Sequence, residues 1–193
     1  MRNIAIFASG NGTNAENIAK YFSKNEKINV ALILSNRADA GVHERARRWG
    51  IPSLVFPKAD FISGEPVLKV LQKYQIDFIV LAGFMCLISE PFLRAFPNRI
   101  VNIHPALLPK FGGKGMFGHH VHEAVVASGE KESGITIHYI NEQYDEGQII
   151  FQASCQLTPN DTPDTVAAKV HALEYQYYPQ IVEQIINDLP ATR

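Results

Sequence analysis

The chain contains little cysteine, almost no net charge and no long apolar run. Its two cysteines, Cys86 and Cys155, form no CxxC pair, so neither a disulfide framework nor a zinc knuckle is indicated. Lysine and arginine number 18 against 19 acidic residues, which gives a formal net charge of −1. No segment resembles a transmembrane helix or a signal peptide, and no basic run favours nucleic acid. We therefore expect a cytoplasmic globular protein without membrane or nucleic-acid partners.

The first eighty of the 193 residues alternate short apolar runs with amphipathic segments, and the pattern continues to a further strand near residue 100. The apolar runs predict strands at 3–9, 29–35, 53–56, 78–81 and 100–104. Helical spacing of apolar residues lies between them, as in Val67, Val70, Leu71 and Tyr74. This order predicts an α/β fold with a doubly wound, mostly parallel sheet and helices on both faces. With no linker or repeat in view, one domain over 1–193 is the economical interpretation.

The second half of the chain is less regular. Residues 107–122 are rich in proline, glycine and histidine and predict a long loop, a feature that is usually functional or disordered. Strands are expected at 134–139 and 148–157, followed by a closing helix that starts at Thr162 and Pro163. Pro179 lies inside that helical pattern, so we expect it to end or kink the helix.

The turn after the first strand has the pattern Gly10-x-Gly12-x-x-Ala15. Such a turn directs backbone N–H groups and a helix N-terminus at one point, which suits a phosphate. The second strand ends without the acidic residue that a dinucleotide site uses for the ribose. Thr13 and Asn14 add donors, so a phosphomonoester fits better than a pyrophosphate, and a plain tight turn is the alternative.

Asn102 and His104 form the strongest chemical pattern. Residues i and i+2 of a strand point to the same side, and this strand ends where open α/β sheets place their ligands. An amide beside an imidazole suits an acyl-transfer site that holds a developing oxyanion. A hydrogen-bonded histidine at a strand end is the alternative.

Other candidates are weaker on their own. Four histidines lie between 104 and 122, but their spacing and the scarcity of carboxylates argue against a metal. Asp145 has the setting of an ordinary turn aspartate. The segment 83–88 is unusually apolar for a loop and could be core or the lining of a pocket, and Cys86 has no base in view to activate it.

Together these segments resemble the glycinamide ribonucleotide formyltransferases of purine synthesis. The matching segments, in the family's order, are Ser9–Asn14 (SGNGTN), Ser35–Asp39 (SNRAD), Leu81–Met85 (LAGFM), Asn102–Pro109 (NIHPALLP), His122–Ala124 (HEA) and Asp145–Ile150 (DEGQII). They span almost the whole chain. The motif N-I-H-P-x-L-L-P with a downstream D-x-G is typical of folate-dependent formyl transfer.

The resemblance implies that 10-formyltetrahydrofolate donates a formyl group to the amine of glycinamide ribonucleotide, without a metal. It implies that Asn102, His104 and Asp145 are catalytic, with Asp145 raising the pKa of His104 so that the imidazolium is available near neutral pH. By similarity, the substrate phosphate is held by Gly12, Thr13 and Asn14, and Glu174 contacts the same substrate. The pterin site is expected at Met85, Cys86, Leu87 and Ile88, beside Asn102.

The chain departs from the family's pattern near the tail of the folate. Relatives often have arginine at the position of Cys86 and near that of Gly64, and the loop Phe111–Gly118 is longer here. Lys114 in that loop is a candidate to replace the lost positive charge. We expect small-molecule partners and a monomer or weak homodimer.

Several alternatives stay open. Methionyl-tRNA formyltransferases share the Asn–His–Asp set but add an RNA-binding domain, and formyltetrahydrofolate deformylases typically have N-I-H-H. An NADP-linked oxidoreductase would use the glycine turn with Arg37, and a phosphosugar-binding protein would need only the turn. Neither of these two explains Asn102 and His104.

Overall fold

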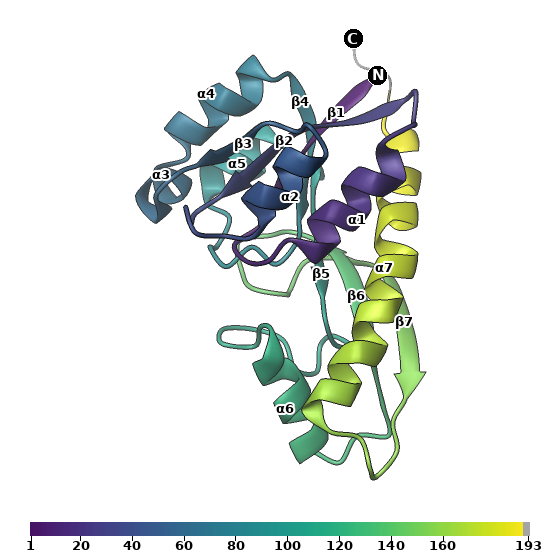
Figure 1. The fold of residues 1–193 in the computed structure, drawn as a ribbon. Helices are drawn as coiled ribbons and strands as arrows, with labels where there is room; N and C mark the ends of the chain where they lie inside the picture. The colour runs from purple at the N-terminus through teal and green to yellow at the C-terminus, as the bar shows by residue number, and fades with distance from the viewer. Residues whose placement is uncertain (191–193) are drawn as a thin grey trace.

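The computed structural model describes residues 1–190; residues 191–193, the end of the predicted domain, lie outside the described residues. Within them the strands are β1 (Arg2–Phe7), β2 (Ile28–Ser35), β3 (Ser53–Val55), β4 (Ile76–Leu81), β5 (Ile100–His104), β6 (Glu132–Tyr139) and β7 (Ile149–Gln156). The helices are α1 (Thr13–Phe22), α2 (Val42–Arg48), α3 (Lys58–Ser63), α4 (Glu65–Lys73), α5 (Glu90–Ala95), α6 (His119–Ala127) and α7 (Pro163–Asn187) (Figure 1).

The seven strands of the described residues form one sheet in the order β3-β2-β1-β4-β5-β6-β7. The first five strands are parallel, while β6 runs antiparallel to both β5 and β7. The strand order reverses between β1 and β4, and at such a switch point the carboxyl ends of the strands leave a crevice for ligands. The predicted mostly parallel, doubly wound sheet is confirmed.

Side chains that alternate along the strands build a core on each face of the sheet. In β1, Ile4 and Ile6 belong to one apolar cluster, whereas Ala5 and Phe7 belong to the other. The first cluster includes residues of α1, α2, α6 and α7, and the second includes residues of α3, α4 and α5. Figure 1 shows α7 passing along β6 and β7, with α6 beside its first turns. The helices therefore cover both faces, as predicted.

One expectation for the second half of the chain is wrong, and of the two alternatives for Pro179, a helix end or a kink, the helix end is wrong. The predicted loop ends before His119, because α6 begins there and Val121 and Val125, four residues apart, pack into the first cluster. Pro179 does not end α7, which continues to Asn187. Beyond the proline, Val182, Ile185 and Ile186 are buried against the sheet, and this burial outweighs the hydrogen bond that proline removes.

Tyr178 joins α7 to the carboxyl ends of the central strands. Its side chain is fully buried, and its hydroxyl donates to the carbonyl of Leu81 at 2.7 Å, with the carbonyl of Val101 at 3.4 Å. Burial raises the pKa of this phenol well above its ordinary value. The phenol therefore remains a hydrogen-bond donor throughout the neutral range.

Removal of this hydroxyl tests the connection between helix and sheet. We expect Tyr178→Phe to lower the free energy of unfolding by about 1–2 kcal/mol, because a buried hydrogen bond is lost without a change of shape. Urea denaturation followed by circular dichroism measures the difference. Tyr175→Phe, at an exposed position of the same helix, is the matched control and should stay within about 0.5 kcal/mol of the parent.

His122 in α6 gives a pH-dependent expectation. Its side chain is buried, its Nδ1 atom has no hydrogen-bond partner, and burial together with neighbouring His171, His119 and His104 lowers its pKa to about 4. The unfolded chain binds the proton at a pKa of about 6.5, so the stability contributed by neutral His122 is lost as the pH falls from 6.5 toward 4. His122→Gln should flatten the loss of unfolding free energy over that window, and the exposed His120→Gln should not. Parallel curves for parent and His122→Gln would contradict this assignment.

Candidate active site

The turn between β1 and α1 presents the start of a helix to a cavity. Gly12 is the N-cap of α1 in a left-handed conformation (φ 77°), and within the described residues no side chain caps this helix start. A Cβ at Gly12 would lie 2.5 Å from a side-chain carbon of Val42, so the turn requires glycine. The first N–H groups of α1, including those of Thr13 and Asn14, are therefore available for an anion.

Asn14 and Glu174 meet across this end of the cavity. The amide Nδ2 of Asn14 donates to Oε2 of Glu174 at 2.9 Å, although 160 residues separate them. Glu174 is 6% exposed, and burial raises its pKa, which the Asn14 hydrogen bond and His171 partly offset. The Oδ1 atom of Asn14 is buried without a hydrogen-bond partner. The structure thus brings two of the predicted substrate-binding residues together.

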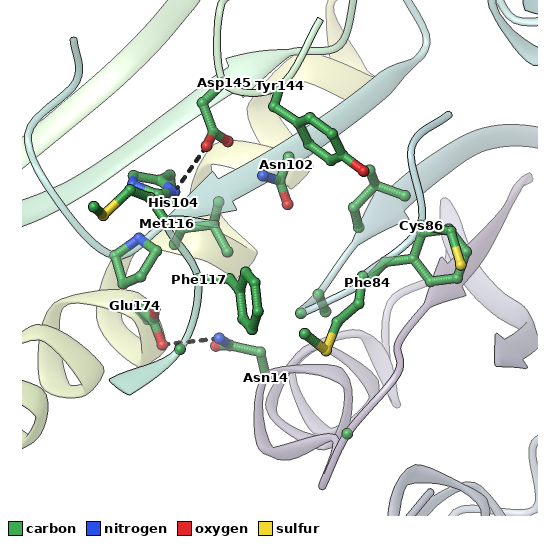
Figure 2. A pocket seen from close by; sticks show the side chains of 18 of the residues that line it. Asn14, Phe84, Cys86, Asn102, His104, Met116, Phe117, Tyr144, Asp145 and Glu174 are labelled. Atoms are coloured by element: carbon green, nitrogen blue, oxygen red, sulfur yellow. Dashed lines mark hydrogen bonds and ion pairs between the residues drawn. The ribbon is translucent and has the colours of Figure 1, made fainter. Parts of the chain in front are cut away.

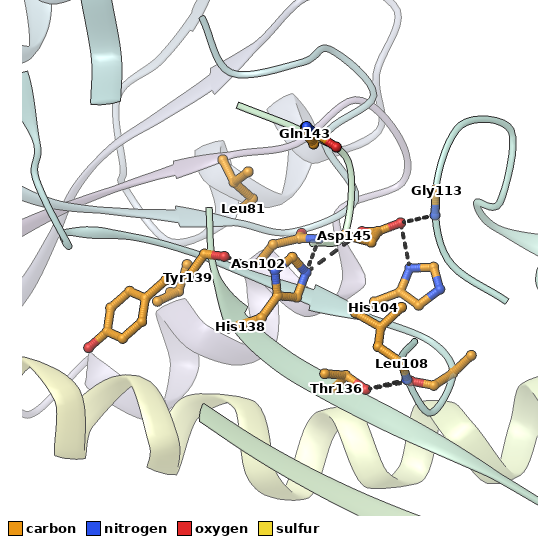
Figure 3. Close-up of polar contacts among 12 residues, drawn as sticks. Leu81, Asn102, His104, Leu108, Gly113, Thr136, His138, Tyr139, Gln143 and Asp145 are labelled. Carbon is orange, nitrogen blue, oxygen red and sulfur yellow. Dashed lines mark hydrogen bonds and ion pairs between the residues drawn. The ribbon is translucent and has the colours of Figure 1, made fainter. Parts of the chain in front are cut away.

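Asn102, His104 and Asp145 converge at the carboxyl end of β5. His104 Nδ1 lies 3.5 Å from Asp145 Oδ2, and Asp145 is held in a left-handed turn conformation (φ 57°) between β6 and β7. The backbone N–H of Gly113 donates to the same carboxylate oxygen at 3.0 Å. Figure 3 shows these contacts in one network. The predicted catalytic residues therefore lie side by side.

His138 belongs to this network and is missing from the sequence prediction. Its Nδ1 atom lies 2.9 Å from the carbonyl oxygen of Tyr139, which can only accept, so Nδ1 carries the proton. The unprotonated Nε2 then accepts from Asn102 Nδ2 at 3.3 Å and lies 3.7 Å from Asp145. Burial lowers the pKa of His138, which favours this neutral form. The ring therefore fixes the orientation of the Asn102 amide.

Both ring nitrogens of His104 face acceptors. Nε2 lies 2.6 Å from the carbonyl oxygen of Phe111 and must donate to it, while Nδ1 faces the Asp145 carboxylate. The expected effect of Asp145 is present, since its charge raises the pKa of His104, but burial lowers that pKa more. The net direction is therefore opposite to the expected one in the unliganded site, because desolvation of a side chain only 3% exposed affects the pKa of His104 more than the attraction of one carboxylate does.

A cavity of about 750 Å³ is lined by Asn14, Asn102, His104, Asp145 and Glu174, among other residues. Its walls come from the first turn, the loop after β4, the end of β5, the 113–119 segment, the β6–β7 turn and α7. Figure 2 shows the Asn14–Glu174 pair on one side, and Asn102, Asp145 and Tyr144 on another. The carboxyl-edge position agrees with the ligand crevice of a doubly wound sheet.

The predicted pterin segment lies on this cavity with two kinds of side chain. Met85 and Leu87 are exposed, whereas Cys86 and Ile88 are buried but still line the wall. The Met85 N–H donates to the Ser9 hydroxyl at 2.8 Å, which joins this segment to the end of β1. Burial raises the pKa of Cys86, so the thiol stays protonated and is a poor nucleophile.

The two positions where relatives often have arginine differ in the structure. Cys86 is 6% exposed, so an arginine there needs space that the thiol does not occupy. Gly64 links α3 to α4 at φ 79°, its added Cβ would lie 2.8 Å from Pro91, and the residue is not part of the cavity wall. Lys114 is exposed and lines the cavity. Its charge is therefore within reach of an anionic group of a bound ligand.

The described part of the chain holds no group of three or more histidine, cysteine, aspartate or glutamate side chains suited to a metal ion. His119 and His122 line the cavity, whereas His120 contacts Glu123 on the surface of α6. Among residues 1–190 no helix is both long and apolar enough to span a bilayer.

Comparison with known proteins places the chain among formyl transferases. Residues 2–182 match the formyl transferase family. The chain is 44% identical to the chloroplastic phosphoribosylglycinamide formyltransferase of Arabidopsis thaliana, over 97% of this chain and 66% of that protein. It is 35% identical to the Bacillus subtilis phosphoribosylglycinamide formyltransferase, over 97% of this chain and 96% of that protein. It spans just under two thirds of the length of the plant relatives.

Solved structures agree with the sequence relatives. The phosphoribosylglycinamide formyltransferase of Anaplasma phagocytophilum superposes with a TM-score of 0.89 at 33% identity, over 97% of this chain and 87% of that one. Glycinamide ribonucleotide transformylase 1 of Symbiobacterium toebii gives a TM-score of 0.88 at 35% identity, over 100% and 91% of the two chains. Fold, motifs and relatives lead to one assignment, and the chain belongs to the formyl transferase family.

Proposed function

We propose that this protein transfers the formyl group of 10-formyltetrahydrofolate to the amine of 5′-phosphoribosylglycinamide, a step of purine synthesis. The observation that carries the proposal is the position of Asn102, His104 and Asp145 on the same cavity as an uncapped helix start that suits a phosphate. The family supplies the formyl chemistry, and the first turn supplies the preference for a phosphorylated acceptor.

The residues present fit this donor and this acceptor. The substrate phosphate would bind the N–H groups of Gly12, Thr13 and Asn14, and Asn14 and Glu174 would contact its sugar. The apolar segment from Met85 to Ile88 would hold the flat pterin ring, next to Tyr144. This arrangement points the amine of the acceptor toward the end of β5. We expect a monomer or a weak homodimer to be sufficient, since one chain supplies every proposed group.

The chemical step follows from the network. The substrate amine attacks the formyl carbon, and negative charge develops on the formyl oxygen. Asn102, whose amide is oriented by His138, donates to that oxygen, and the positive charge of a protonated His104 ring stabilises the developing anion. The bond from the formyl carbon to the folate nitrogen then breaks, and a proton passes from the amine to that nitrogen through Asp145 and His104.

The same three residues would serve formyl transfer to any acceptor that reaches the formyl carbon. The experiment must therefore identify the acceptor. Purified protein is incubated with 10-formyltetrahydrofolate and 5′-phosphoribosylglycinamide while the folate absorbance and the formylated product are followed. Methionyl-tRNA and water alone are the competing acceptors. Turnover that requires methionyl-tRNA, or equal turnover without any acceptor, would contradict the proposal.

Variants of the three residues test the mechanism. Asn102→Ala removes an oxyanion donor and should lower kcat about 10²–10³-fold with little change in substrate binding. Since Asn102 and Asp145 act on one transition state, Asn102→Ala combined with Asp145→Asn should cost less than the product of the two single losses. Initial rates over a matrix of substrate concentrations provide kcat and KM. Fully multiplicative losses would mean that Asp145 acts independently of this site.

The pH dependence gives a separate test of Asp145. The carboxylate raises the pKa of His104 while burial lowers it. Asp145→Asn removes the first effect and leaves the second, so His104 loses its proton at a lower pH and the alkaline limb of the rate profile moves to lower pH. The measurement is kcat/KM against pH for parent and variant, and an unshifted limb would show that the carboxylate does not act on His104.

Lys114 tests recognition of the folate tail. An exposed cation contributes about 0.2–1 kcal/mol to an ion pair, so Lys114→Ala should raise the donor's KM by a factor between about 1.4 and 5, with kcat unchanged. The effect should shrink as salt is added. Lys110→Ala is the control, because Lys110 is exposed and pairs with Glu130 away from the cavity. Equal donor KM values for the two variants would remove Lys114 from the site.

A further inference from the structure

Phe117 is a large apolar side chain that the core does not enclose. It lines the cavity and is 48% exposed. Two neighbouring apolar residues of the same loop, Phe111 and Met116, pack instead against the first apolar cluster. The ring of Phe117 meets the ring of His120 edge-on, with 5.7 Å between centroids. Core packing therefore explains Phe111 and Met116 but not Phe117.

The backbone of the loop directs Phe117 into the cavity. The Phe111 carbonyl accepts from His104, and the Gly113 N–H donates to Asp145, so the loop is attached to the proposed catalytic pair. Gly118, which follows Phe117, adopts φ 56° and ψ −134°, a conformation that is essentially restricted to glycine. A Cβ at Gly118 would meet nothing within 4 Å, so glycine is needed there for conformation and not for space.

The position of the ring separates two groups of residues. Figure 2 shows it between the Asn14–Glu174 pair and the cluster of Asn102, His104 and Asp145. In the proposed reaction the first pair contacts the acceptor and the second cluster acts on the formyl group. The ring therefore lies on the cavity wall beside the place where acceptor and formyl group would meet, and it makes that part of the wall apolar.

We propose that Phe117 keeps water from the formyl carbon and so determines that an amine, and not water, is the acceptor. This inference rests on the proposed function. The competing reaction balances without a further reactant: water adds to the formyl carbon, the bond to the folate nitrogen breaks, that nitrogen takes a proton, and formate leaves. The same oxyanion donors serve both reactions, so Asn102 and His104 do not discriminate between them. Discrimination requires exclusion of water, which an apolar ring provides.

The test measures how the formyl group is divided between two products. Parent, Phe117→Ala, Phe117→Val and Phe117→Leu are each incubated with 10-formyltetrahydrofolate and 5′-phosphoribosylglycinamide, and formate and formylated product are both quantified. Phe117→Ala should raise the ratio of formate to product about tenfold or more, which corresponds to ~1.4 kcal/mol between the competing transition states. Phe117→Leu, which keeps an apolar side chain of similar reach, should restore most of the parent ratio, and Phe117→Val should fall between.

Controls separate this role from a structural one. Ile62→Ala removes an exposed apolar side chain outside the cavity and should leave the ratio unchanged. Thermal unfolding checks that each variant folds, and the graded valine and leucine variants keep the test valid if the alanine variant does not. An unchanged ratio of formate to product in an active Phe117→Ala enzyme would overturn this inference and leave the proposed function standing. Slower transfer without extra formate would do the same. A parent enzyme that forms no formylated product would instead overturn the proposed function and this inference with it.

Discussion

The antiparallel pairing of β5 with β6 is the constraint on which the site depends. Its register sets Asn102 opposite His138 and His104 opposite Thr136. Because strand side chains alternate with a period of two, a slip of one residue would turn Asn102 and His104 to the other face of the sheet. The same pairing leads the chain from β6 into the turn that holds Asp145. Thr136 donates to the Ala106 carbonyl and accepts from the Leu108 N–H, which fixes the segment after His104.

Burial and charge act against each other throughout this site. Three titratable side chains are nearly inaccessible to solvent: Glu174, His104 and His138. Burial raises the pKa of Glu174 and lowers the pKa of both histidines, and each change favours the neutral form. Hydrogen bonds from neighbours recover part of that cost, as Asn14 does for Glu174. Such shifts are expected where a protein prepares a low-dielectric cavity for a polar reaction, because charges that develop there are stabilised by fixed donors and not by water.

Local sequence patterns predict the fold and the pair Asn102 and His104, but not the other two members of the network. Alternating apolar runs indicate the parallel sheet, and i, i+2 spacing places Asn102 with His104. Asp145 is 41 residues beyond His104, and its local setting favours an ordinary turn, so only the family resemblance selects it. His138 escapes prediction because a histidine inside an apolar strand looks like a core residue. The start of α6 is hidden by the glycine-rich segment before it. The alternative that Pro179 ends the helix fails because local rules do not count the apolar burial beyond it.

The lowered pKa of His104 has a consequence for how the reaction is stabilised. In the unliganded site one carboxylate does not compensate for the desolvation of an imidazolium. In the proposed reaction the formyl oxygen acquires charge near the ring, and this second anion raises the pKa of His104. The protonated form of His104 is thus favoured most when the oxyanion forms, and least when the substrate is still neutral. An interaction that strengthens from ground state to transition state lowers the barrier, whereas a permanently charged histidine would bind both states more equally.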